Sequence, residues 1–276
     1  MDRHAPDARS DSAAIAQRLV EARRQAIALP DYPGPLPVGL GDGYACQDAA
    51  IALWGLPVVG WKVGKIPAEW EHRLGEERLV GPIFQGAVQT QSREPARFAV
   101  IAGGFAAVEA EFVFRIARDA SPEKTDYTAA EAAELVAALH VGIELAGSPL
   151  PLINVLGPPV VVSDFGNNAG LVLGTEITDW ARRTADELAC ETFIDGHLVG
   201  EGGAASIAGG LLAALAFALS RGARRGHPLK RGMLVTTGAA TGIHDIVAGQ
   251  RARVSFGEWG ELHCDAVAAE PQQARA

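Results

Sequence analysis

The sequence predicts an α+β protein, with a small, mainly helical segment at residues 1–57 and a larger, strand-rich body at residues 58–270. Before residue 57, apolar residues recur at helical spacing and proline and glycine mark the breaks. From residue 58 onward, most apolar runs are short and rich in valine, isoleucine and phenylalanine, as in strands. Because strands dominate the middle and end, we expect an α+β or mostly-β body rather than a repeated βαβ unit.

The helical segment is predicted to contain two helices separated by a loop. Residues 1–9 are expected to form a disordered tail, and the first helix starts on a polar cap at Ser10 and ends before Pro30. Residues 31–43 are predicted as a loop, because they carry three prolines and four glycines. A short second helix is expected at residues 45–53.

The body is predicted to contain many short strands, two helices and several loops. Strands are expected at 58–64, 98–101, 106–117, 141–146, 160–162, 188–194, 197–199, 232–237, 251–256 and 261–268, with a turn at 82–86 that enters a further strand. Asp195-Gly196 is the strongest hairpin signal. Helices are expected at 128–139, opened by the capping box Thr128-x-x-Glu131, and at 207–220. Residues 65–82 are charged and are expected to be irregular.

Composition limits the classes of partner. The chain has 276 residues, 48% of them hydrophobic, and its formal net charge of −9 disfavours nucleic acid or an anionic membrane as the main partner. No apolar stretch reaches the roughly 20 residues that span a bilayer, and the polar N-terminus lacks the apolar core of a signal peptide. Cys46, Cys190 and Cys264 show no CxxC spacing and fit a reducing compartment. We therefore expect a soluble, cytoplasmic protein.

Two glutamates mark the strand predicted at residues 106–117. Side chains alternate along a strand, so Glu109 and Glu111 project from the same face, within an apolar run that contains Val108 and Phe112. Glu144 lies in a second apolar run of the same kind. Like charges on a buried surface are costly unless a cation neutralises them, and three carboxylates suit a hard divalent ion. The alternative is a solvated strand face or a structural ion pair.

Lys62 is the candidate acid–base group. It lies in the apolar run Val58-Val-Gly-Trp-Lys-Val-Gly64, where a lysine often extends its amine to water. If it were part-buried beside a metal ion, desolvation and the field of the cation would lower its pKa towards neutrality.

The loops at 164–170 and 236–242 are rich in small, hydroxyl and amide residues. Such loops can present N–H groups to a bound carboxylate, although each could also be an ordinary turn.

At these residues the chain resembles the fumarylacetoacetate hydrolase superfamily, and within it the 2-keto-4-pentenoate (2-hydroxypentadienoate) hydratases. The resemblance covers about residues 60–268. It rests on Gly60-Trp-Lys-Val-Gly64, Arg78-Leu-Val-Gly-Pro-Ile-Phe84, Glu109-Ala-Glu111, Gly142-Ile-Glu-Leu-Ala-Gly147, the run from Asp164 to Gly174, and Val235-Thr-Thr-Gly238. The ordered set, rather than any one motif, is typical of the superfamily.

The resemblance implies a mixed β-roll or sandwich body and a homo-oligomer, which could associate with a related pathway enzyme. It implies Mg²⁺ or Mn²⁺ at Glu109, Glu111 and Glu144, and an active site that includes Lys62. Its small-molecule substrate would be a 2-oxo or 2-hydroxydienoic acid from the catabolism of aromatic compounds. Hydration would convert a 2-hydroxy-2,4-dienoate into a 4-hydroxy-2-oxo acid. We expect Lys62 to transfer protons and Asn168, Thr237 and Gly238 to hold the substrate carboxylate or the attacking water.

Three departures from the hydratase pattern keep other functions open. Val80-Gly81-Pro82 stands where an aspartate is common, Gly147-Ser148-Pro149 where an arginine is common, and Ile207-Ala-Gly-Gly210 where a leucine-glycine-x-proline segment is common. The alternatives are a decarboxylase of a 2-oxo-3-enedioate (4-oxalocrotonate-like), an acylpyruvate C–C hydrolase, for which His72 is the nearest candidate base, and a non-catalytic binding subunit.

Overall fold

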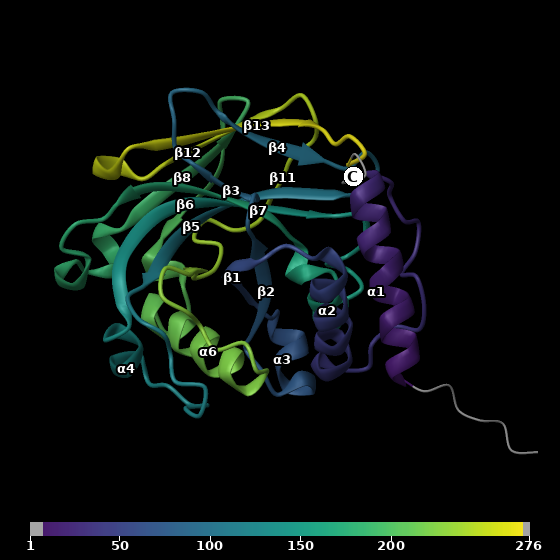
Figure 1. Ribbon diagram of the computed structural model, residues 1–276. Helices are drawn as coiled ribbons and strands as arrows, with labels where there is room; N and C mark the ends of the chain where they lie inside the picture. Colours follow the sequence, from purple (N-terminus) through teal and green to yellow (C-terminus); the bar gives the residue numbers. More distant parts are fainter. Residues whose placement is uncertain (1–7, 273–276) are drawn as a thin grey trace, which may run out of the picture.

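Two β-sheets and a group of helices form the protein (Figure 1). The structure, a computed structural model, describes residues 8–272. One sheet has the order β2 (Arg78–Phe84), β1 (Val58–Lys65), β10 (Leu234–Thr236), β5 (Phe105–Ile116), β6 (Val136–Ser148), β7 (Asn168–Glu176), β3 (Val88–Thr90), and β11 (His244–Asp245) also pairs with β5. The other has the order β4 (Ala96–Val100), β13 (Glu261–Ala268), β12 (Arg251–Ser255), β8 (Ala189–Ile194), β9 (His197–Gly203).

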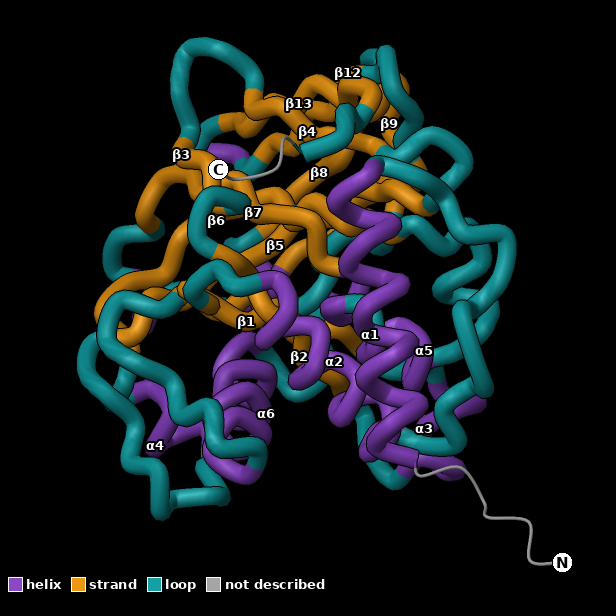
Figure 2. The backbone as a smooth tube through the Cα atoms, turned by 45° about the vertical axis from the view of Figure 1, so that its right-hand side comes forward, coloured by secondary structure: helices purple, strands orange, loops and turns teal. Residues whose placement is uncertain are grey.

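Within the described residues the helices are α1 (Ala8–Gln25), α2 (Leu40–Trp54), α3 (Ala68–Leu74), α4 (Ala129–Ala133), α5 (Pro158–Ser163) and α6 (Leu211–Arg224). Helices α2, α3, α4 and α6 lie at the opposite end of the molecule from the β4–β9 sheet, and α1 runs along one side towards that sheet (Figure 1, Figure 2). None of them is both long enough and apolar enough to cross a bilayer. The mixture of curled sheets and few helices confirms the predicted α+β class.

The predicted hairpin is confirmed. Strands β8 and β9 pair in antiparallel fashion and meet at Asp195-Gly196, where both residues have positive φ angles, 51° and 80°. Such angles at both central positions are what a tight two-residue hairpin turn needs. The strands predicted near 98–101, 106–117, 251–256 and 261–268 are confirmed as β4, β5, β12 and β13.

Two predictions were wrong in kind. Residues 65–82 are not irregular, because they contain α3 and most of β2. Strand β2 pairs with β1 along its length. Because the charged residues Glu76 to Arg78 come directly before its apolar residues, the sequence did not indicate where this strand begins. Residues 160–162 form part of α5 instead of a strand. Valine favours strands, but Pro158 and Pro159 occupy the first turn of this helix, where proline is accommodated, and α5 packs against α2.

Other predictions were right in kind but displaced. The capping box of Thr128 and Glu131 forms, but α4 ends at Ala133, because residues from Val136 onward pair with β5. Helix α6 starts at Leu211 rather than at 207, and α2 starts at Leu40, inside the predicted loop. Of the predicted tail, residues 1–7 lie outside the described residues, and α1 already begins at Ala8.

A continuous hydrophobic core joins the helices to both sheets. It includes Leu19 of α1, Tyr44 of α2, Phe112 of β5 and Val254 of β12, all of them buried. The helical segment therefore shares one hydrophobic core with the sheet that carries the three glutamates. The division of the chain at residue 57 stays a prediction.

Candidate metal centre

Strands β5 and β6 bring the three predicted glutamates together. They pair in antiparallel fashion with Glu109 directly opposite Glu144, and Glu111 lies two residues along the same face. One carboxylate oxygen from each of the three lies within 4.8 Å of the others. All three side chains are buried, so the alternative of a solvated strand face is wrong.

Neighbouring donors hold two of the carboxylates. The backbone N–H groups of Thr237 and Gly238 donate to Glu111 Oε2 at 2.9 and 2.8 Å. The Asn168 amide donates to Glu144 Oε1 at 3.3 Å. In contrast, the Oε1 atoms of Glu109 and Glu111 are buried and accept no hydrogen bond in the structure. Unpaired buried carboxylate oxygens are costly, and these two belong to the same cluster.

Lys62 reaches the cluster from β1, on the far side of β10. Its Nζ atom lies 3.3 Å from Glu144 Oε1, and the side chain is 4% exposed. The alternative in which this lysine extends to water is therefore wrong. Since β10 follows β1 by about 170 residues in the chain, this contact depends on the long-range pairing of β1 with β10 and of β10 with β5.

The electrostatics of the cluster are those of an excess of buried negative charge. Burial raises the pKa of Glu109 to about 7, opposed by Lys62 and reinforced by Glu144. Burial also raises the pKa of Glu111, and the charges of Glu144 and Glu109 add to the rise. For Lys62, burial alone would lower the pKa, but the attraction of the three carboxylates outweighs burial and raises it. The lowering expected from the sequence therefore requires a cation that takes up the charge of the carboxylates.

The residues of the cluster fit a divalent cation. Three carboxylates and one ammonium leave a formal charge of −2 inside the protein, which one divalent ion would balance. The donor set consists of oxygen atoms, which Mg²⁺, Mn²⁺ and Ca²⁺ prefer, and two of these atoms lack any other partner.

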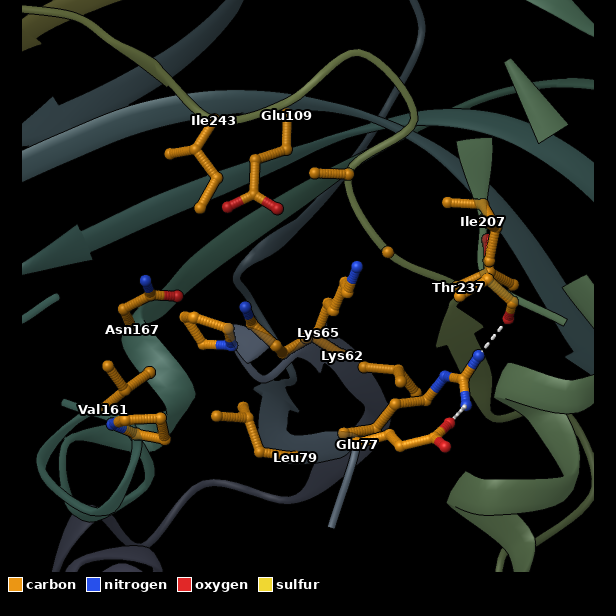
Figure 3. A pocket seen from close by; sticks show the side chains of 18 of the residues that line it. Lys62, Lys65, Glu77, Leu79, Glu109, Val161, Asn167, Ile207, Thr237 and Ile243 are labelled. Carbon is orange, nitrogen blue, oxygen red and sulfur yellow. Dashed lines mark hydrogen bonds and ion pairs between the residues drawn. The ribbon is translucent and has the colours of Figure 1, made fainter. Parts of the chain in front are cut away.

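A cavity of about 730 Å³ opens beside the cluster (Figure 3). Glu109 and Lys62 line it from β5 and β1, Asn167 from the turn before β7, and Thr237 from the loop after β10. The remaining wall is mainly apolar and includes Leu79, Val161, Ile207 and Ile243. A cavity of this size can take a small organic acid with one end near the glutamates.

The three predicted substrate-binding residues lie at different places. Thr237 and Gly238 line the cavity, although the Thr237 hydroxyl donates to the carbonyl of Phe112 at 3.0 Å. Asn168 lies next to Glu144 and does not line this cavity. Its neighbour Asn167 does line the cavity, although Asn167 was not among the residues predicted to bind substrate. The Asn167-Asn168 pair indicated that an amide side chain lies at the site. It did not indicate which of the two residues faces the cavity.

Gly81 belongs to the segment Val80-Gly81-Pro82, in which the hydratase pattern often has an aspartate, and the structure requires glycine at position 81. A Cβ atom at position 81 would overlap the carbonyl oxygen of Phe165 and lie 2.9 Å from the Cα of Gly166. Gly81 also pairs with Lys62 across β1 and β2. The close approach of the turn at residues 165–166 to β2 therefore excludes any side chain at this position.

We expect Gly81→Ala to destabilise the protein by at least about 2 kcal/mol, because the clash is with backbone that cannot rotate away. The measurement is the free energy of unfolding in denaturant. Gly41→Ala is the control, since nothing lies within 4 Å of a Cβ at this helical position and alanine favours a helix. Equal stabilities of the two variants would contradict the backbone contact.

Comparisons with known proteins give matches among solved structures. No protein-family model matches the sequence. No curated protein matches it either. The structure is similar to 4-oxalocrotonate decarboxylase from Pseudomonas putida G7 complexed with magnesium and adipate, with a TM-score of 0.78 and 16% identity, covering 96% of this chain and 100% of that chain. It is also similar to fumarylpyruvate hydrolase from Pseudomonas aeruginosa in complex with Mn²⁺ and pyruvate, with a TM-score of 0.54 and 18% identity, covering 77% and 91%.

A third similar structure is 2-hydroxyhepta-2,4-diene-1,7-dioate isomerase from Mycobacterium marinum, with a TM-score of 0.54 and 16% identity, covering 77% of each chain. Identities this low establish the fold and leave the reaction open.

Proposed function

Because the chain has the fold of the fumarylacetoacetate hydrolase superfamily, as its motifs predicted, we propose that it is a divalent-metal-dependent enzyme acting on a 2-oxo acid or its enol. One observation carries the proposal: three buried carboxylates with two unpaired oxygens and a buried ammonium stand at one end of a cavity. The first candidate reaction is the hydration of a 2-hydroxy-2,4-dienoate to a 4-hydroxy-2-oxo acid.

Glu109, Glu111 and Glu144 would hold the metal ion, Mg²⁺ or Mn²⁺. When bound, such an ion supplies Lewis acidity towards the substrate carboxylate and 2-oxo oxygen, and so stabilises negative charge on that oxygen. The two N–H groups of Thr237 and Gly238 fix Glu111 through its Oε2 atom, which would leave its Oε1 atom free to bind the ion. Two of the similar structures, those complexed with magnesium and with Mn²⁺, support a divalent ion at such a site.

Lys62 is the proposed proton carrier. Ketonisation removes the proton of the 2-hydroxyl group and adds a proton at carbon 5, which leaves an unsaturated ketone with its double bond between carbons 3 and 4. Water then adds its oxygen at carbon 4 and a proton at carbon 3. Each step needs a group that gives or takes a proton near the oxo acid, and Lys62 is the ammonium at the glutamate end of the cavity. Asn167, Thr237 and Gly238 line the space in which the carboxylate or water would be held.

The direct test uses Mg²⁺ and 2-hydroxypenta-2,4-dienoate. We expect the dienol absorbance to decrease and a 4-hydroxy-2-oxo acid to form, and both changes to stop when the metal is chelated. Turnover that persists in excess chelator would contradict the proposal.

Decarboxylation of a 2-oxo-3-enedioate is the second candidate, and a feature of the cavity wall favours it. Lys65 and Arg78 are directly opposite each other on β1 and β2, and both line the cavity. Like charges at directly opposed positions repel, and an anion between them removes the repulsion. Arg78 already contacts Glu77 at 3.6 Å, whereas no ion pair of Lys65 is found within residues 8–272. Lys65 is three positions beyond Lys62, which is roughly 10 Å along a strand and leaves room for a second carboxylate.

Lys65→Met separates the two candidates. With Mg²⁺ present, we expect wild-type protein to bind 2-oxoadipate about tenfold more tightly than 2-oxohexanoate if the substrate is a diacid, and the variant to lose this preference. Isothermal titration calorimetry measures both affinities, and Lys230→Met, which removes an exposed lysine paired with Asp119, is the control. Equal binding of the two acids by the wild-type protein would favour the hydratase.

The remaining alternatives have no feature of their own in the described residues. His72, the candidate base of an acylpyruvate hydrolase, lies on α3 but does not line the cavity. A protein that retains no metal and turns over none of the three substrate classes would be a non-catalytic binding subunit. The homo-oligomer and its association with a related pathway enzyme stay predictions, and light scattering of the purified protein measures the first.

A further inference from the structure

The turn that precedes β7 is strained and lies against the candidate metal centre. Phe165, Gly166 and Asn167 have φ angles of 56°, 62° and 57°, so three successive residues are left-handed. This conformation is unfavourable for phenylalanine and persists only where surrounding contacts enforce it. The turn positions both amides of the site: Asn167 lines the cavity, and Asn168 donates to Glu144.

The side chain of Arg23, on α1, supplies contacts at both ends of this turn. Its guanidinium donates to the Asp164 carboxylate at 2.6 and 2.9 Å, just before the turn. It also donates to the carbonyls of Asn168 at 3.3 Å, just after the turn, and of Gly147 at 2.7 Å. Gly147 is three residues beyond Glu144 on β6. One buried guanidinium thus joins both ends of the turn to the strand that carries the third glutamate.

Two further contacts hold the Asp164 carboxylate and the Phe165 ring in this arrangement. Ser148 Oγ donates to Asp164 Oδ2 at 2.5 Å, and the Arg23 guanidinium lies 5.2 Å from the centre of the Phe165 ring. The side chains of Arg23 and Asp164 are 9% and 1% exposed. All the nitrogens of Arg23 are engaged, so this group is not available to bind a ligand and its role is structural or positional.

We propose that Arg23 is a positioning residue of the metal centre. It fixes the turn at residues 165–167, and thereby Asn168, so that the carboxylate of Glu144 keeps its orientation toward the ion. The inference rests on the proposed metal site. It gives the N-terminal helix α1 a role in that site, which the sequence motifs of residues 58–270 do not indicate. A group that orients a metal ligand typically changes metal affinity by about 10- to 100-fold.

The test compares Arg23→Lys with Arg24→Lys. Lysine at position 23 keeps a charge for Asp164 but cannot reach both carbonyls, because it lacks the planar fork of arginine. Arg24 is the matched control: it is the next residue of α1 and donates to the carbonyls of Leu53 and Trp54, away from the site. Mn²⁺ affinity and the Mn²⁺ electron paramagnetic resonance spectrum are measured at a temperature where each protein is folded. Hydrogen exchange of residues 165–168 is measured without metal.

We expect Arg23→Lys to weaken Mn²⁺ binding about tenfold, to alter the Mn²⁺ spectrum and to speed exchange in the turn, and Arg24→Lys to change none of these. An Arg23→Lys protein that binds Mn²⁺ within twofold of wild type would overturn the proposal. If that variant does not fold, the test uses Ser148→Ala, which removes one donor to Asp164 and no charge. We expect Ser148→Ala to weaken Mn²⁺ binding about threefold, and unchanged binding would overturn the proposal. Wild-type protein that binds no Mn²⁺ would refute the metal site itself, while hydrogen exchange would still decide whether Arg23 holds the turn.

Discussion

Glu109→Ala is expected to abolish the binding of Mg²⁺ and Mn²⁺, with a loss of affinity of at least about 100-fold. The variant loses one of three ligands, and this carboxylate is one of the two whose Oε1 atom has no other partner. Removing one of several ligating carboxylates costs more than removing a group that only orients a ligand, for which 10- to 100-fold is typical. Isothermal titration calorimetry with Mn²⁺ measures the loss directly.

A second substitution at this position, Glu109→Gln, separates a metal site from a structural ion-pair cluster. Without metal, Glu109 adds a buried negative charge beside Glu111 and Glu144, and burial already raises its pKa to about 7. Replacing it by the isosteric Glu109→Gln therefore should not lower the melting temperature of the metal-free protein. Glu201→Gln, on an exposed strand position, is the control for both measurements. If Glu109→Gln instead destabilises the metal-free protein strongly and leaves Mn²⁺ binding intact, the cluster is structural.

The alternation of side chains along a strand made part of this site predictable. Glu109 and Glu111 had to share a face once residues 106–117 were identified as a strand. The pairing of Glu144 with Glu109 could not be derived from the sequence, because the register of two strands joined by a long connection is not evident from it. A shift of one residue would have turned Glu144 to the other face of the sheet.

The rest of the site could not be predicted from the sequence, because its residues come together from distant parts of the chain. Lys62 joins the glutamates only because β10 pairs with both β1 and β5. Arg23 belongs to a helix with ordinary amphipathic spacing, and nothing in its local sequence indicates the partner at Asp164. The choice between Asn167 and Asn168 depends on three left-handed residues, a conformation that Phe165 would not adopt without these tertiary contacts.

The largest expected effect on the reaction is that of Lys62→Met. If Lys62 carries the proton, kcat should fall by about 10²- to 10⁴-fold, the usual contribution of a positioned acid–base group. Metal-dependent exchange of the carbon-3 protons of 2-oxoadipate or 2-oxohexanoate with D₂O, followed by NMR, measures proton transfer without knowledge of the natural substrate. Lys230→Met is the control, since this exposed lysine is paired with Asp119.

A simultaneous rise in metal affinity would distinguish proton transfer from a merely structural role. The Lys62 ammonium lies 3.3 Å from Glu144 Oε1 and competes with a cation for the charge of the carboxylates. Its removal should therefore leave Mn²⁺ binding as tight as in the wild-type protein or tighter, while exchange is lost. A variant that keeps the wild-type exchange rate would remove Lys62 from the chemistry. A variant that loses both proton exchange and Mn²⁺ binding would show that Lys62 stabilises the metal site. Loss of proton exchange with Mn²⁺ still bound is the result expected of a proton carrier.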